Sequence, residues 1–279
     1  MSFFLERVIR YVRRNLASLF FRRPYSIDLD RPIISFTFDD FPRTALLAGG
    51  EILRRYGLVG TYYAALGLLG GDSPSGPIFV VEDLKKALDD GHELGCHTFS
   101  HCDSWKTLPH AFEQSILQNQ RALSELIPDY KFKSFSFPIC SPRPMSKRAA
   151  ARYYLTSRGG GQTFNSGIAD LNQLSAFFLE RAGGDLELPK ALIDRNRKAK
   201  GWIVFATHDI SRSPSQYGCT PEFFEEVVRY AVQSGAQILS VADALDVIRA
   251  TRTIRQNIPV AGLTESTTAK LDCPKTESQ

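Results

Sequence analysis

The stretch IISFTFDD (33–40) sets the fold of this chain, because six residues of strand character are followed directly by two carboxylates. Working outward, further apolar runs of strand length occur at intervals along the sequence. They are expected at VGTYYAAL (59–66), HELGC (92–96), near 132–137, 153–156 and 176–179, at WIVFAT (202–207) and at QILS (237–240). The sequence therefore predicts many short strands separated by segments of a different character.

The segments between the strands have the spacing of helices. Their expected positions are 44–56, 81–90, 110–127, 188–200, one helix that begins at Thr220-Pro221 and one that begins at Val241. Thr220 suits the N-cap and Pro221 the first helical position. Strand and helix alternation of this kind predicts an α/β fold with a parallel sheet covered by helices. In a single domain of this size a (β/α) barrel is expected rather than an open sheet.

Composition is that of an ordinary globular protein, with 43% hydrophobic and 23% charged residues among 279. The formal net charge of +4 is too small to indicate a nucleic-acid partner. We expect three parts: a basic amphipathic helix and linker over 1–30, the barrel over 31–250, and a polar tail over 251–279 that lacks the periodicity of a folded segment.

Residues 3–21 combine an apolar stripe with arginines at helical spacing. Two interpretations remain open. The helix packs its apolar face on the barrel, or it lies on an anionic membrane surface as a peripheral contact. The sequence contains no run of about 18 apolar residues, so no membrane span is predicted. The five cysteines fit no disulfide or CxxC pattern, and the N-terminus has no secretory pattern. These features favour a cytoplasmic protein, with the inner face of the membrane as the site of any peripheral contact.

Polar side chains that suit catalysis follow three of the predicted strands. Asp39 and Asp40 come directly after the first strand, His97 follows the third, and His208 follows WIVFAT. The carboxyl ends of barrel strands form the active face, so these side chains are expected to meet there. Each alone has a structural explanation, such as a loop aspartate or a buried core histidine. Their arrival from three separate strand ends favours a functional site.

His97 and His101 are separated by four residues, which would place both rings on one side if this segment turns helically. Two histidines and a carboxylate from another loop make a three-ligand site with an open position, the catalytic arrangement for zinc. Cobalt or nickel would accept the same donors. The remaining histidines, His92 and His110, are expected to have structural roles only.

The motifs TFDD (37–40) and HTFSH (97–101), together with the strand-end His208, resemble those of the polysaccharide deacetylases. This family shares the NodB homology domain with chitooligosaccharide and peptidoglycan deacetylases. The resemblance spans about residues 33–248. It implies a distorted (β/α)7 barrel of the TIM type and a divalent metal ion, usually zinc. It also implies that Asp40, His97 and His101 bind the metal, that Asp39 is the general base and that His208 is the general acid.

The sequence departs from the family in its third motif. Ser136 stands where the family has an arginine that orients the catalytic aspartate, and Ile139 stands at an aromatic position. A guanidinium from a neighbouring loop could replace the missing one, and Arg158 and Arg143 are the two candidates. The backbone N–H of Ile139 could still donate to an oxyanion, because a backbone donor does not depend on the side chain.

The resemblance implies a hydrolase that removes N-acetyl groups from an amino-sugar-containing oligo- or polysaccharide. Two alternatives remain. One is a hydrolase of small cyclic amides or imides on the same fold. The other is a carbohydrate-binding protein with weakened catalysis, which the missing arginine favours. The expected partner is an N-acetylated carbohydrate, and the sequence gives no signal that sets an oligomeric state.

Overall fold

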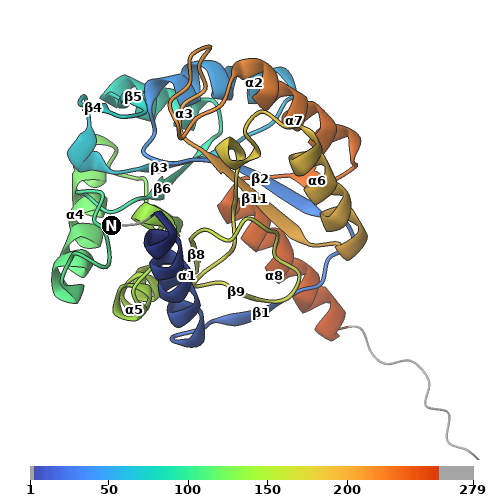
Figure 1. The fold of residues 1–279 in the computed structure, drawn as a ribbon, viewed down its shortest axis with the longest axis horizontal. Coiled ribbons are helices and arrows are strands. Elements are labelled where there is room, and N and C mark those ends of the chain that lie inside the picture. Colours follow the sequence, from blue (N-terminus) through green and yellow to red (C-terminus); the bar gives the residue numbers. More distant parts are fainter. Residues whose placement is uncertain (1–2, 258–279) are drawn as a thin grey trace, which may run out of the picture.

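The computed structural model describes residues 3–257 and contains a curled parallel sheet surrounded by helices (Figure 1). The strands follow the order β10-β11-β2-β3-β6-β7-β8, and β12 also pairs with β2. Their bounds are β2 (Ile33–Phe38), β3 (Thr61–Ala64), β6 (Glu93–Cys96), β7 (Ser134–Ser136), β8 (Thr156–Arg158), β10 (Phe177–Phe178), β11 (Trp202–Thr207) and β12 (Gln237–Ile238). All of these pairings are parallel, as the sequence predicts.

The two ends of the sheet approach each other through one short segment. Arg158 at the end of β8 forms a parallel bridge with Leu174, and the chain then runs into β10, which pairs with β11. The sheet is therefore strongly curled, and the bridge at Leu174 lies three residues before β10 begins. The predicted α/β barrel of distorted shape is confirmed.

Helices cover the outside of the curled sheet (Figure 1). A π-helical turn (Ala45–Gly50) leads into α2, and a 3-10 turn (Leu179–Ala182) follows β10. The α-helices are α1 (Phe3–Leu19), α2 (Glu51–Arg55), α3 (Val81–Asp89), α4 (Pro109–Leu126), α5 (Pro144–Tyr153), α6 (Glu187–Ala199), α7 (Pro221–Gln233) and α8 (Val241–Asn257). Thr220 caps α7 as expected, since its side chain accepts a hydrogen bond from the backbone N–H of Phe223 at 3.2 Å.

Strands β2, β3, β6, β7, β8, β10 and β11 are buried along their whole length, as is usual for a parallel sheet covered on both faces. All six residues of β2 are buried. Inside the core, Phe36 stacks on Phe205 of β11 at 5.6 Å between ring centroids and meets Phe224 of α7 edge-on at 5.5 Å. This packing joins the sheet to its outer helices and fixes the strand ends in space.

A buried carboxylate ties together the amino ends of the strands. Glu93 begins β6 and accepts hydrogen bonds from Thr61 Oγ1 of β3 at 2.9 Å and Ser134 Oγ of β7 at 2.6 Å. It also accepts one from the backbone N–H of Ala242, in the first turn of α8, at 2.9 Å. A carboxylate is well placed at a helix N-terminus, where unpaired N–H groups carry partial positive charge.

Several predicted boundaries are wrong. The strand expected at 153–156 lies at 156–158, because the segment that begins at Pro144 forms α5 and continues through Tyr153. Residues 251–257, expected in the tail, are the last turns of α8, whereas 258–279 lie outside the described residues. Two antiparallel strand pairs were not predicted. They are β1 (Pro24–Ile27) with β9 (Gly167–Asp170), and β4 (Asp72–Ser73) with β5 (Gly76–Pro77).

Among residues 3–257, no helix has both the length and the apolar character to cross a bilayer. Within the same range the four cysteines are free thiols.

Candidate active site

The loops that follow β2, β6 and β11 bring four of the predicted residues together. Asp39 and Asp40 directly follow β2, His97 directly follows β6, and His208 directly follows β11. The second histidine of the predicted pair, His101, lies four residues after His97. The strand ends converge because β2 pairs with β11 on one side and with β3, the neighbour of β6, on the other.

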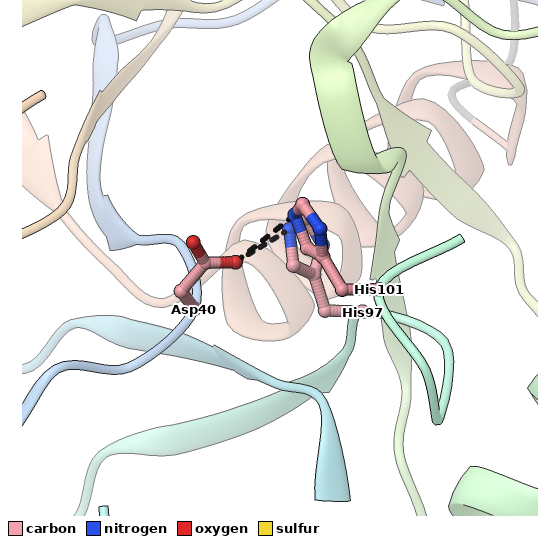
Figure 2. Close-up of side chains that lie close together, drawn as sticks. All are labelled: Asp40, His97 and His101. Atoms are coloured by element: carbon pink, nitrogen blue, oxygen red, sulfur yellow. Dashed lines mark ion pairs between the residues drawn. The ribbon is translucent and has the colours of Figure 1, made fainter. Parts of the chain in front are cut away.

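Asp40, His97 and His101 form a compact group of side chains (Figure 2). Asp40 Oδ1 lies 3.4 Å from His97 Nε2 and 3.1 Å from His101 Nε2. One ligand atom from each residue lies within 4.8 Å of the others, a separation that suits a single metal ion. The rings do not converge through a helical turn as expected. Instead Thr98 and His101 adopt positive φ angles of 59° and 47°, so the loop folds back on itself.

The hydrogen bonds around these residues leave His97 Nε2 and Asp40 Oδ1 available to bind a metal ion. His97 Nδ1 lies 2.8 Å from the carbonyl oxygen of Ser136, which can only accept, so Nδ1 carries the proton and Nε2 presents its lone pair. Asp40 Oδ1 is buried and has no hydrogen-bond donor among the described residues. One carboxylate and two imidazole donors therefore fit a divalent cation.

Asp39 faces a different set of partners. Its side chain is buried, and its Oδ1 contacts Arg158 Nη2 and accepts a hydrogen bond from Ser136 Oγ at 3.2 Å. Burial alone would raise the pKa of Asp39, but the charge of Arg158, with smaller contributions from the nearby histidines, holds that pKa below its usual value. Asp39 is thereby kept ionised.

Arg158 supplies the guanidinium that position 136 lacks, so the predicted location of this side chain is confirmed. It is 1% exposed, and its guanidinium carbon lies 4.8 Å from the ring centroid of Tyr63 and 5.6 Å from that of Phe178. Stacking against two aromatic rings stabilises a buried cation. The other candidate, Arg143, precedes α5, where its backbone N–H donates to Ser104 Oγ at 3.0 Å. Arg158, rather than Arg143, contacts Asp39.

His208 lies on the other side of Asp40. Its Nε2 is 3.9 Å from Asp40 Oδ2, and its Nδ1 is 3.2 Å from the carbonyl oxygen of Tyr217. Because that carbonyl only accepts, Nδ1 carries a proton and Nε2 points toward the site. Asp209 accepts hydrogen bonds from Ser215, which closes the loop that carries Tyr217. The roles of Tyr217 and Asp209 were not foreseen, since a backbone carbonyl leaves no signal in the sequence.

Ile139 lies in the loop after β7 with a φ of 61° and an exposed side chain. For a β-branched residue this conformation is unfavourable by roughly 1–3 kcal/mol. Six of the nine non-glycine residues with positive φ in the described chain lie in the loops after β2, β6 and β7: Asp40, Phe41, Thr98, His101, Ile139 and Cys140. Backbone strain concentrated in these loops is typical of a functional site.

Glu180 is a further acidic group near the site that the sequence interpretation missed. It lies two residues after the end of β10, in FFLE (177–180), and an acidic residue so soon after an apolar run could have revealed it. Burial raises the pKa of Glu180 to about 8, and its carboxyl group is electrostatically coupled to Asp39 and Arg158. Glu180 Oε2 is buried without a hydrogen-bond partner among the described residues.

Comparison with known proteins finds a similar family over part of the chain and a similar fold over most of it. Residues 26–156 match the family model described as polysaccharide deacetylase. A curated gellan lyase from a Bacillus species is 28% identical over 143 residues, which cover 44% of this chain and 6% of that protein. The chain thus spans a small fraction of the length of that relative.

Several solved structures have a similar fold. A family 4 acetyl xylan esterase from Clostridium thermocellum, in complex with a cobalt ion, has a TM-score of 0.55 at 19% identity, covering 77% of this chain and 91% of that one. A peptidoglycan deacetylase from Bacillus subtilis gives 0.54 at 17%, covering 82% and 96%. A CE4 family pseudoenzyme from Bacillus anthracis gives 0.54 at 12%, covering 78% and 66%.

At these identities the structures show the barrel fold alone, whereas the family model matches the part of the chain that carries Asp39, Asp40, His97 and His101. Taken together, residues 26–156 are similar to the polysaccharide deacetylases, and the curled parallel barrel with polar residues at its strand ends agrees with that similarity.

Proposed function

We propose that this protein is a metal-dependent hydrolase that removes N-acetyl groups from an amino-sugar-containing oligo- or polysaccharide. The match of residues 26–156 to the polysaccharide deacetylase model supports carbohydrate deacetylation as the class of reaction. The observation that carries the proposal is the grouping of three ligand-type side chains beside a separate, arginine-paired aspartate. A site that only binds a metal has no need for the second carboxylate.

Asp40, His97 and His101 would hold the cation. Zinc is the first expectation for one carboxylate and two imidazoles with an open position, and cobalt or nickel also accept these donors. A bound divalent ion supplies Lewis-acid chemistry, which polarises the acetyl carbonyl and acidifies water. Ser136, through its carbonyl oxygen, orients the His97 ring so that Nε2 faces the site.

Asp39 would accept the proton of the attacking water. Its two fixed partners, Arg158 and Ser136 Oγ, both bind Oδ1, which leaves Oδ2 for the water. The guanidinium holds the carboxylate in one orientation and keeps it ionised. General-base catalysis of this kind contributes about 10²–10⁴-fold to the rate.

His208, with both ring nitrogens protonated, would donate its Nε2 proton to the departing nitrogen and return to the neutral Nδ1–H form. An amide nitrogen is a poor leaving group unless it is protonated, and Nε2 of His208 is the ring atom directed toward the site. The backbone N–H of Ile139, in the loop after β7, would donate a hydrogen bond to the oxyanion that forms at the acetyl carbon.

The main competing proposal is a weakened, carbohydrate-binding member of the family. Ser136 in place of the arginine favours it, and the similar fold of a pseudoenzyme shows that this barrel also occurs without activity. The contact between Arg158 and Asp39 favours catalysis instead, because it restores a positive charge at the carboxylate.

Acetate release tests the proposal. The protein, first freed of metal by chelation, is supplied with zinc and assayed on N-acetylglucosamine oligomers, peptidoglycan fragments and O-acetylated xylan. We expect zinc-dependent release from an N-acetylated substrate. Release from xylan alone would identify an esterase, and binding without release from any substrate would favour the weakened, carbohydrate-binding protein.

A further inference from the structure

The outer face of α1 is apolar and exposed. Seven large hydrophobic side chains in α1 and the two residues after it are between 39% and 73% exposed: Val8, Tyr11, Val12, Leu16, Leu19, Phe20 and Phe21. In a helix of 3.6 residues per turn, Val8, Val12 and Leu16 lie one above another on one side. The described part of the apolar stripe is therefore turned toward solvent, although the helix itself contacts the barrel through its other side.

The opposite side of α1 contacts the barrel. Ala17, nearly half a turn around the helix from Val8, is fully buried. Its carbonyl oxygen accepts a hydrogen bond at 3.0 Å from Nζ of Lys147, a buried residue of α5 that also pairs with Asp170. Surface helices of globular proteins normally bury their apolar stripe. Here a small residue and a buried lysine fix the helix with that stripe outward.

Positive charge accompanies the apolar stripe. Residues 1–23 contain six arginines and one glutamate. Arg22 is exposed, and the guanidinium carbon of Arg148 lies 5.5 Å from the ring centroid of Phe21. The guanidinium carbon of Arg13 lies 4.9 Å from the ring centroid of Trp105. One guanidinium thus borders the exposed hydrophobic residues at Phe21, and Arg22 adds an exposed positive charge next to that residue.

We propose that the outer face of α1 binds the surface of a lipid bilayer that contains anionic headgroups. A helix with an apolar face and an arginine-rich polar face lies in the plane of the interface, with its apolar side among the acyl chains. Arginines near the surface are attracted to the negative headgroups. A second copy of this chain is a poorer occupant, because two segments that each carry this excess of arginine repel each other.

The contact would also orient the active site. Trp105, which stacks with Arg13, lies in the loop that follows His101, and its Nε1 donates to the carbonyl oxygen of Ser141 at 2.8 Å. This places α1 beside loops that border the candidate site. If the proposed deacetylase function is correct, the enzyme would act on acetylated carbohydrate held close to a membrane. The lipid contact itself does not depend on that function.

Sedimentation with vesicles tests the proposal. The full chain is mixed with phosphatidylcholine vesicles that contain or lack 30% phosphatidylglycerol. We expect the protein to sediment with the anionic vesicles, to bind the neutral ones more weakly, and to be released in part by high salt. The variant Val12→Glu/Leu16→Glu should reduce binding about tenfold or more, since it places charge in the apolar face. Substitution is preferable to deletion, which would uncover Lys147.

The matched control is Gln114→Glu/Gln118→Glu, which makes the same change in charge at two exposed positions on α4. It should bind as the unchanged protein does. Thermal unfolding shows whether each variant is folded. The proposal is overturned if the unchanged protein stays in the supernatant with every vesicle, or if both double variants bind equally. Loss of a dimer in the α1 variant, without vesicle binding by the unchanged protein, would identify a second copy as the occupant.

Discussion

At the scale of single residues, Asp39 and Asp40 are adjacent in sequence but face different partners. Asp40 lies against two imidazoles, whereas Asp39 lies against a guanidinium and a hydroxyl. We expect Asp40→Asn to lose metal, measured by elemental analysis, and activity with it. Asp39→Asn should keep its metal while kcat falls about 10²-fold or more. Metal loss in Asp39→Asn with retention in Asp40→Asn would reverse the two roles.

Ser136 and Arg158 are also linked, because they are directly paired residues of the neighbouring strands β7 and β8. Both contact Asp39 Oδ1, so an arginine from either strand should reach it. We expect Arg158→Ser to lower kcat about 10²-fold with little change in metal content. The exchange Ser136→Arg/Arg158→Ser should recover part of that loss, measured with kcat and KM separately.

A purely structural role for Arg158 predicts a different result for the exchange. The melting temperature would recover without kcat, or neither would recover. Arg158→Lys is the matched control, since it keeps the charge but loses the planar guanidinium. It should retain more activity than Arg158→Ser.

At the scale of elements, Glu93 joins β3, β6, β7 and the start of α8. Glu93→Ala removes the acceptor for three buried donors and leaves them unpaired. We expect the free energy of unfolding to fall by about 2–4 kcal/mol. Denaturant titration measures this change. Glu113→Ala, in a solvent-exposed pair with Arg152, is the control and should change stability by less than about 1 kcal/mol.

At the scale of the whole molecule, buried His92 should make stability depend on pH. Its Nδ1 accepts the backbone N–H of Gly60 at 3.0 Å, which requires the neutral ring, and burial lowers its pKa to about 4. Between pH 6.5 and 4 the unfolded chain binds a proton at this residue and the folded chain does not. Stability should therefore fall as pH falls through this range, by about 2–3 kcal/mol from this residue. In His92→Asn this contribution should be absent.

Glu180 should make stability depend on pH in the opposite direction. Because burial raises its pKa to about 8, the folded chain keeps a proton between pH 4.5 and 8 that the unfolded chain has lost. Its contribution to stability is therefore present at low pH and is lost as pH rises toward 8. Chemical denaturation of Glu180→Gln across this range should show higher relative stability at pH 8 than at pH 5, compared with the unchanged protein. An identical pH profile for the two would contradict this assignment.

The sequence by itself determined the parallel α/β arrangement and the strand-end positions of Asp39, Asp40, His97 and His208. These features follow from local patterns, since an apolar run forms a buried strand and the polar residues after it emerge at the end of that strand. The boundaries of α5 and β8 were misplaced because the tyrosines at 153 and 154 suit either element.

Only the tertiary structure decided the features that depend on contacts between distant residues. It selected Arg158 over Arg143, because the pairing of β8 with β7 places position 158 beside position 136 and hence beside Asp39. It also turned the apolar stripe of α1 outward, because Ala17 and Lys147 hold the other face against α5. A helical pattern fixes which residues share a face, but packing against the rest of the chain decides which face meets solvent.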